Sequence, residues 1–161
     1  MIRHPIEPVY DADSKILILG SFPSVKSRES GFFYGHPQNR FWRVLAAVTG
    51  QEAPQTIEEK KDFLLKNHIA VWDVIQSCTI TGSSDSSIKD VVVNDLTKIL
   101  DSTEIGQIYV NGRKAEQLYQ KYIYPKTGIK AVCLPSTSPA NAAWNLERLV
   151  DVWRKIAVYC G

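Results

Sequence analysis

Four short apolar runs, spread along the whole chain, most constrain what this sequence can fold into. They lie at Lys15–Leu19, Ile69–Val74, Ile105–Val110 and Ile129–Leu134. The segments between them carry apolar residues at helical spacing, so strand-like and helix-like patterns alternate. This alternation predicts an α/β fold in which parallel strands are joined by crossover helices.

The predicted helices have clear apolar faces. Stripes of apolar residues predict helices over Phe41–Val48, Ala115–Tyr122 and Leu146–Ile156. Thr56 and Glu59 have the spacing of a capping box, which predicts another helix running toward Asn67. The serine-rich stretch Gly82–Asp90 is the most loop-like part of the chain.

The size and composition narrow the class of protein. A chain of 161 residues, 44% of them hydrophobic, has the size of one globular domain, so we expect a single domain over 1–161. The net charge of +2 neither requires nor excludes a polyanionic partner, so nucleic-acid contacts would depend on local patches. No apolar stretch is long enough to cross a bilayer, and the first residues lack a signal-peptide core, so we expect a cytoplasmic protein without membrane contact.

The three cysteines argue against a disulfide framework. Cys78, Cys133 and Cys160 are odd in number, far apart, and in no C-x-x-C pair suited to a metal. We expect reduced and mostly buried thiols.

All four predicted strands are followed by polar residues. The segments after them are Gly20–Pro23, Asp73 at or near its strand's end, Asn111-Gly112 and Pro135–Pro139. In sheets of this type, ligands bind outside the carboxyl ends of the parallel strands. The four segments are therefore expected to form one cleft.

The segment after the last strand can bind an anion. Ser138 can cap a helix whose first residue is Pro139, and free backbone N–H groups beside hydroxyls attract phosphate. The alternative is that this serine is only a helix cap.

The stretch from Gly20 to Trp42 is rich in aromatic rings and in cations. Phe32, Phe33 and Tyr34 supply flat apolar faces, which suit a nucleobase. Cations flank these rings, as in nucleic-acid clefts, at Lys26, Arg28, Arg40 and Arg43. The alternative is that the rings cover the core.

Three further polar residues could be functional, but each also has an ordinary structural explanation. Asn39 could be only the N-cap of the helix that begins near Arg40, and Asp73 could pair with a neighbouring cation. His36, a lone histidine in a loop, is more often structural than catalytic. The sequence contains no serine nucleophile elbow, no HExxH and no Walker loop.

Three motifs together resemble the uracil-DNA glycosylase superfamily, and specifically its hypoxanthine-DNA glycosylase branch. They are GSFPS after the first strand, HPQNRFW opening the first helix and PSTSPAN after the last strand, and the resemblance spans Ile16 to about Trp153. It implies a three-layer α/β/α sandwich with a central four-stranded parallel sheet. It also implies excision of a deaminated base that is flipped out of DNA, without metal or cofactor.

Two departures from the superfamily pattern imply an unusual catalytic residue. The Asp or Asn that handles the catalytic water is replaced here by Phe22, and the later His, Asn or Met is replaced by Leu134. The resemblance to the hypoxanthine branch implies that Asn39 takes over. An amide is no useful base, so we expect Asn39 to orient the water through its carbonyl oxygen.

The resulting assignment covers three groups of residues. Asn39 is the expected catalytic residue; the expected base-binding residues are Phe22, Phe33, Tyr34, Asp73 and Asn111; the expected DNA phosphate-binding residues are Ser21, Ser136, Thr137, Ser138 and Asn141. No metal ligand is assigned, and a monomer is expected.

Asp73 suggests how the base is selected. A carboxylate accepts but cannot donate, and hypoxanthine presents a ring N–H where adenine presents a lone pair. Guanine and uracil also present a ring N–H, so this contact alone does not exclude them. The alternatives are a uracil or G:U/T mismatch-specific glycosylase of the same fold, a non-catalytic nucleic-acid-binding module, and a hydrolase of free nucleosides.

Overall fold

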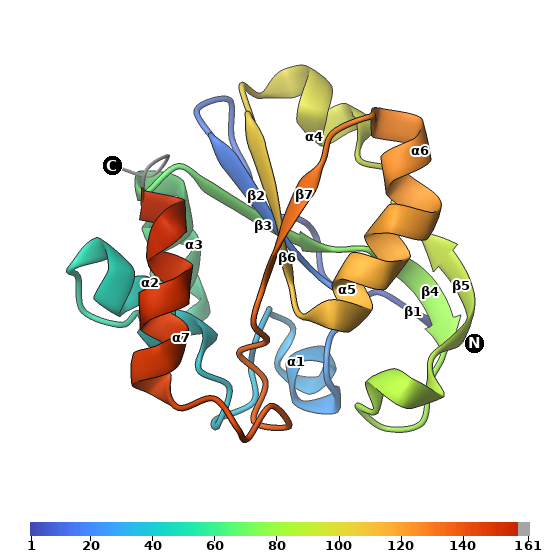
Figure 1. Cartoon of the computed structure of the whole chain (residues 1–161), viewed down its shortest axis with the longest axis horizontal. Coiled ribbons are helices and arrows are strands. Elements are labelled where there is room, and N and C mark those ends of the chain that lie inside the picture. Colours follow the sequence, from blue (N-terminus) through green and yellow to red (C-terminus); the bar gives the residue numbers. More distant parts are fainter. Residues whose placement is uncertain (158–161) are drawn as a thin grey trace.

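The computed structural model describes residues 1–157, and its centre is the predicted parallel sheet (Figure 1). The strand order is β3-β2-β6-β7, with bounds Ile69–Asp73, Ile16–Gly20, Gln107–Asn111 and Ala131–Leu134. These are the four predicted apolar runs, with small shifts at their ends. β2 lies inside the sheet and all five of its residues are buried, which is why it reads as a continuous apolar run.

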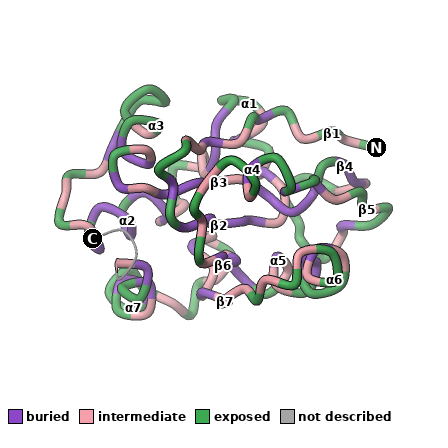
Figure 2. The backbone as a smooth tube through the Cα atoms, turned by 90° about the horizontal axis from the view of Figure 1, so that it is seen from above, coloured by how far each residue is buried: buried purple, intermediate pink, exposed green. Residues whose placement is uncertain are grey.

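Helices cover both faces of this sheet, which confirms the three-layer arrangement. On one face lie α2, α3 and α7, with bounds Phe41–Thr49, Ile57–Lys66 and Leu146–Trp153 (Figure 1). On the other face lie α4, Thr97–Ser102; α5, Arg113–Leu118; a π-helical turn, Tyr119–Ile123; and α6, Tyr124–Thr127. The tube in Figure 2 is mostly buried along β2, β3 and β6 and exposed on the outer sides of α6 and α7.

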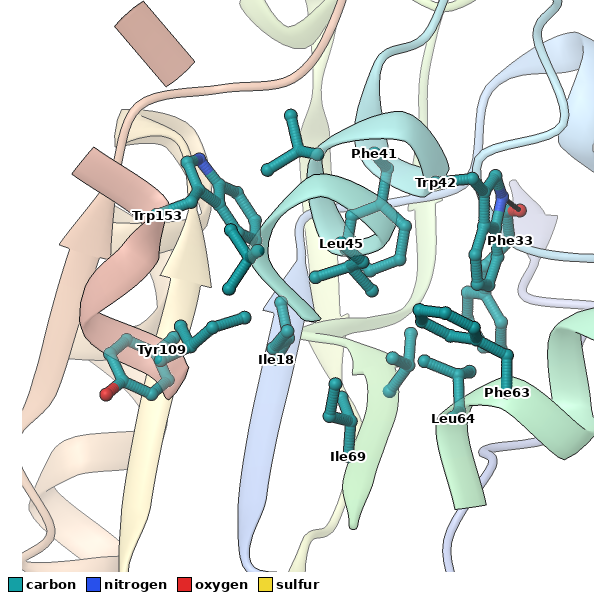
Figure 3. Packing of buried hydrophobic residues seen from close by; sticks show 14 of the residues in the cluster. Ile18, Phe33, Phe41, Trp42, Leu45, Phe63, Leu64, Ile69, Tyr109 and Trp153 are labelled. Carbon is teal, nitrogen blue, oxygen red and sulfur yellow. Dashed lines mark hydrogen bonds between the residues drawn. The ribbon is translucent and has the colours of Figure 1, made fainter. Parts of the chain in front are cut away.

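The core on the α2 side consists of large rings and branched chains (Figure 3). The ring of Phe41 from α2 meets that of Trp153 from α7 edge to face, with centroids 5.9 Å apart. The indole N–H of Trp153 donates to the carbonyl of Pro135 at 3.0 Å. The core thereby also fixes the start of the segment that follows β7.

The predicted capping box is confirmed. The hydroxyl of Thr56 accepts from the N–H of Glu59 at 3.0 Å, and the Glu59 side chain accepts from the N–H of Thr56 in return. α2 ends at Gly50, whose φ of 69° suits the left-handed turn that glycine tolerates.

A second, antiparallel sheet was not predicted. It has the order β1-β4-β5, with bounds Ile2–Arg3, Ile75–Thr79 and Lys89–Val93. The predicted loop Gly82–Asp90 is therefore wrong at its end, because its last two residues belong to β5. A short helix, α1, Val25–Ser30, also lies within the aromatic-rich stretch and is capped by Ser24.

The predicted helix at Pro139 is wrong. The Ser138 hydroxyl accepts from the N–H of Ala140 at 3.1 Å within a turn, and α7 begins only at Leu146, where Asn145 is the N-cap. The guanidinium of Arg40 explains the non-helical path. It donates to the carbonyls of residues along this segment, namely Ser138, Asn141 and Trp144. The N–H groups of a helix beginning at Pro139 are thus absent from the expected phosphate site.

Two further findings bear on the protein's surroundings. No helix within residues 1–157 is both long and apolar enough to cross a membrane. Cys78 is buried and Cys133 half-buried; both are free thiols, and burial raises the pKa of each. Cys160 lies outside the described residues.

Candidate active site

A cavity of about 310 Å³ lies at the carboxyl ends of the parallel strands, the lower edge of the sheet in Figure 1. It brings together segments that are far apart in sequence, because parallel strands end at the same edge. The predicted site residues that line it are Ser21, Phe22, Phe33, Tyr34, Asn39, Asp73, Asn111, Ser136, Thr137 and Ser138. Asn141 instead lines an adjoining cavity of about 580 Å³, which shares Ser136 and Ser138 with the first.

The carbonyl oxygen of Asn39 is already occupied. It accepts from the N–H of Phe41 at 2.9 Å and from the hydroxyl of Thr137 at 2.9 Å. Because a backbone N–H can only donate, the amide oxygen must face Phe41 and the amide nitrogen must face away from it. The expected use of this oxygen to hold water is therefore corrected: the group available to a water is Nδ2. The N-cap of α2 is Arg40, so Asn39 stands one residue before it, although its oxygen still takes up the N–H of the first helical residue, Phe41.

Asn111 and Thr137 form one connected network with Asn39. Asn111 Nδ2 donates to the Thr137 hydroxyl at 3.1 Å, and Asn111 Oδ1 accepts from the Thr137 N–H at 3.1 Å. Thr137 is fully buried. Its hydroxyl thus links two amides inside the protein, which does not fit the predicted phosphate contact. Asn111 lines the cavity, and this link uses its Oδ1 and one of the two hydrogens on its Nδ2.

Asp73 stands at the end of β3 with one oxygen paired and one open. Its Oδ2 lies 2.7 Å from Nε2 of His4, and the two side chains are 5% and 3% exposed. Among residues 1–157, no side chain or backbone group donates to Oδ1. The partner is a histidine from the N-terminal segment, not the Arg or Lys considered in the plain alternative.

The aromatic residues divide into buried and cavity-facing groups. Phe32 and Phe33 are 3% and 2% exposed, so these rings belong to the core as the alternative held, although Phe33 also lines the cavity. The ring of Tyr34 stacks on Phe41 with centroids 3.8 Å apart. The Tyr34 hydroxyl is buried without a hydrogen-bond partner among the described residues; burial, together with the charge of Asp73, raises the pKa of Tyr34.

The loop after β7 presents hydroxyls that keep a hydrogen to donate. Ser136 Oγ accepts from the N–H of Ser138, and Ser138 Oγ accepts from the N–H of Ala140, each at 3.1 Å. The O–H of each serine has no acceptor within the loop, which leaves it available to a phosphate oxygen. Asn141 braces the loop through its Nδ2, which donates to the Ser136 carbonyl at 3.0 Å. The remaining predicted phosphate ligand, Ser21, donates to Asp85 at 3.2 Å.

None of the four expected cations lines either cavity. Arg40 and Arg28 donate to backbone carbonyls of the protein, and the Arg28 guanidinium also lies over the ring of Phe22 at 5.6 Å. Arg113 and Lys114, at the start of α5, line the second cavity instead. Sequence analysis missed these two, although they follow directly on the Asn111-Gly112 strand exit. His4 and Asp85 were missed as well, since no local pattern connects them to the site.

No group of three or more potential metal-binding side chains occurs within residues 1–157. The arrangement instead combines amides, hydroxyls and a buried carboxylate around a cavity edged by aromatic rings. Such a site can hold a flat polar molecule by hydrogen bonds and position a water beside it.

Comparison with known proteins agrees with this geometry. The model of the uracil DNA glycosylase superfamily matches residues 7–157. A protein of Methanosarcina acetivorans named hypoxanthine DNA glycosylase is 36% identical over 150 residues, covering 92% of this chain and 94% of that protein. One of the same name from Methanosarcina barkeri is 32% identical over 143 residues, covering 88% and 89%. The solution NMR structure of a candidate uracil DNA glycosylase from M. acetivorans superimposes with a TM-score of 0.83 at 33% identity, covering 98% of this chain and 97% of that one.

Proposed function

The chain belongs to the uracil DNA glycosylase superfamily, and we propose on this basis that it is a DNA repair glycosylase that removes hypoxanthine from DNA. One observation carries the proposal. A single cavity is lined by Asn39, by Asp73 with an open Oδ1, and by the hydroxyl-bearing loop after β7. These are the three groups that base release requires: one for the water, one for the base and one for the DNA backbone.

The reaction is hydrolysis at C1′ of the flipped nucleotide. A water oxygen bonds to C1′ while the C1′–N9 bond breaks and its electron pair goes to the base. The base leaves as neutral hypoxanthine after taking up a proton, and the water's excess proton passes to solvent. The products are an abasic deoxyribose and the free base. We assign Asn39 to the water, with Nδ2 donating to the water oxygen and so orienting a remaining lone pair toward C1′.

Asp73 is the proposed base reader. Its Oδ1 accepts from N1–H of hypoxanthine, whereas adenine would direct a lone pair at a negatively charged oxygen. A buried acceptor left unpaired carries a penalty of about 1–3 kcal/mol, which opposes binding of adenine. Phe22 and Tyr34 are the cavity rings proposed to flank the extruded base.

Ser136 and Ser138 are proposed to grip backbone phosphates beside the flipped nucleotide. Both hydroxyls stand on a loop whose conformation is fixed by two hydrogen bonds. Arg40 donates to the carbonyl of Ser138, and Asn141 donates to the carbonyl of Ser136. Ser21 and Asn141 complete the proposed phosphate-binding group. Thr137 supports this loop from inside.

The test is an excision panel under single-turnover conditions, with duplexes that contain hypoxanthine, uracil or xanthine. We expect release of hypoxanthine, slowed on the order of 100-fold by Asn39→Ala. Asp73→Ala is expected to slow release and to narrow the preference for hypoxanthine over adenine. Asn145→Ala is the matched control, because it deletes the same side chain from the N-cap of α7 outside the cavity.

Three results would reject the proposal. Release of uracil with hypoxanthine untouched would assign the uracil-specific alternative. Binding without release of any base would favour a nucleic-acid-binding module. Full activity of both Asn39→Ala and Asp73→Ala would remove the catalytic assignment.

We further propose that residues 1–161 act as one domain, as a monomer and in the cytoplasm. Free thiols at Cys78 and Cys133 suit a reducing compartment. Sedimentation of the protein with and without a DNA duplex checks the monomer, which would be rejected by two copies in the free protein.

A further inference from the structure

We propose that His4 is a positioning residue for base recognition, which holds the Asp73 carboxylate so that Oδ1 faces the cavity as a fixed acceptor. This inference rests on the proposed function and adds to it how the base-reading group is kept in place. His4 does not line the cavity. It stands behind Asp73 and acts through it.

The hydrogen-bond geometry determines which ring nitrogen of His4 carries the hydrogen. The backbone N–H of Ile6 donates to Nδ1 at 3.1 Å, so Nδ1 must be an acceptor without a hydrogen. The hydrogen of the neutral ring is then on Nε2, which lies 2.7 Å from Oδ2 of Asp73 and donates to it. Both ring nitrogens are satisfied, and the tautomer is unambiguous.

The surroundings prevent the His4 ring from turning away. The backbone N–H of His4 donates to the carbonyl of Gln76 at 2.7 Å, which continues the pairing of β1 with β4. The ring meets Phe22 edge to face with centroids 5.8 Å apart, and it lies 6.0 Å from Phe33 and 6.5 Å from Trp72. The residue that follows β1, His4, therefore has its ring packed among three aromatic side chains next to Asp73.

Gly20 makes room for the open oxygen of the carboxylate. A Cβ on this residue would lie 2.4 Å from Oδ1 of Asp73, closer than any real contact. Gly20 and Asp73 are register partners at the ends of β2 and β3. Oδ2 is thus held by His4, while Oδ1 lies over the glycine and has no donor among residues 1–157.

A fixed acceptor discriminates better than a mobile one. A carboxylate that could rotate would pair with bases in several orientations. With Oδ2 occupied by His4, only Oδ1 can meet the base, and only a base that offers a ring N–H at that point is accepted. Hypoxanthine has such an N–H, and adenine does not.

Two substitutions of His4 separate its two hydrogen bonds. In His4→Asn, a δ oxygen can still accept from Ile6 but no group reaches Asp73. In His4→Gln, the ε nitrogen can still donate to Asp73. We expect His4→Asn to slow single-turnover release of hypoxanthine by about 10- to 100-fold, as for loss of a hydrogen bond to a charged group, while duplex affinity stays within about twofold. His4→Gln is expected to stay within about fivefold of the parent.

A double substitution tests whether His4 acts through Asp73. Adding His4→Asn to Asp73→Ala is expected to change the rate by less than about twofold, because the partner is already gone. A further large loss in the double variant would overturn the proposal, as would parental rate and base preference in His4→Asn. Failure of the parent to release hypoxanthine would instead reject the proposed function.

A measurement on the unsubstituted protein does not depend on how the variants fold. Nitrogen-15 NMR of the labelled histidine rings is expected to show a hydrogen on Nε2 of His4 and none on Nδ1. A hydrogen on Nδ1 would overturn the proposed arrangement.

Discussion

Among single residues, Thr137 is the one whose hydroxyl, together with the Phe41 N–H, holds the amide oxygen of Asn39. Thr137→Val keeps the shape of the side chain but removes the donor to Asn39 Oδ1. We expect release of hypoxanthine to slow about tenfold, equivalent to about 1.4 kcal/mol, because the amide is then held only by the Phe41 N–H. Thr137→Ser keeps the hydroxyl and is expected to stay near the parental rate. Single-turnover rates, compared at equal duplex affinity, check this; a fully active valine variant would contradict it.

Gly20 is required by the closeness of Asp73. Gly20→Ala would place its Cβ 2.4 Å from Asp73 Oδ1 and 3.1 Å from the Tyr34 hydroxyl. We expect the free energy of unfolding to fall by about 1–3 kcal/mol and hypoxanthine release to be lost, because the carboxylate must move. Gly106→Ala is the matched control, since nothing lies within 4 Å of the added atom. Urea unfolding and excision assays measure both; equal behaviour of the two variants would refute the crowding argument.

The unpartnered hydroxyl of Tyr34 predicts a pH-dependent difference in stability. Burial raises the pKa of Tyr34, so the folded protein keeps the hydrogen where the unfolded chain, with an ordinary value of about 10, loses it. Stability of the parent should therefore fall as the pH rises through about 10, since the unfolded state then binds fewer protons. Tyr34→Phe lacks this group. We expect it to be as stable as the parent at neutral pH or up to about 1 kcal/mol more stable, with its advantage growing above about pH 10.

The free energy of unfolding in urea is compared between Tyr34→Phe and the parent, once at neutral pH and once above about pH 10. Other tyrosines and lysines titrate in both proteins, so their effects cancel in the difference. A constant difference between neutral and alkaline pH would show that Tyr34 ionises in the folded protein as it does in the unfolded chain.

The composition of the cavity was predictable from the strand exits, but its hydrogen bonds were not. Asn39, Asp73 and Ser136 stand where apolar runs or helices begin and end, and the rule for parallel sheets places such positions together. The contact between His4 and Asp73 spans 69 positions, and that between Thr137 and Asn39 spans 98. Neither leaves a local pattern. The direction of the Asn39 amide is set by the nearby Phe41 N–H, but the second hydrogen bond to its oxygen comes from the distant Thr137.

At the level of elements, α3 provides a test of stability separate from function. Its capping box joins Thr56 and Glu59, and none of its residues lines the cavity. We expect Thr56→Ala to lower the free energy of unfolding by about 1 kcal/mol with excision unchanged, because an N-terminal N–H of the helix loses its acceptor. Thr56→Ser should be nearly neutral. Urea unfolding checks both, and an alanine variant as stable as the parent would show that water replaces the cap.

The elements that sequence patterns missed have physical reasons. β1 has two residues, and β4 and β5 contain exposed positions that interrupt any apolar run. The segment after β7 contains a Ser-Pro pair typical of a helix start, yet Arg40, the N-cap of α2, donates hydrogen bonds to its carbonyls and holds it in another path. That interaction spans about a hundred positions. β2 has the same length as β4 and β5 but was predicted, because burial on both faces gives it a continuous apolar composition.

For the whole molecule, a small net charge means that DNA must be attracted by a local patch. Arg113 and Lys114 line the second cavity, which shares Ser136 and Ser138 with the proposed base pocket. We expect the DNA strand on either side of a flipped nucleotide to pass over this patch. Lys15 precedes β2 and stands at the opposite edge of the sheet.

These positions predict how duplex affinity depends on salt. Arg113→Ala and Lys114→Ala should each weaken binding to duplexes with hypoxanthine, with uracil or with normal bases by the same factor. Each should also reduce the slope of log Kd against log salt by about one, because one fewer phosphate counterion is released. Lys15→Ala removes one positive charge as well, but at the opposite edge of the sheet. It should change neither the duplex affinity nor the slope of log Kd against log salt. Fluorescence anisotropy over a range of salt concentrations measures both, and a loss of affinity confined to the hypoxanthine duplex would move Arg113 and Lys114 from backbone binding to base recognition.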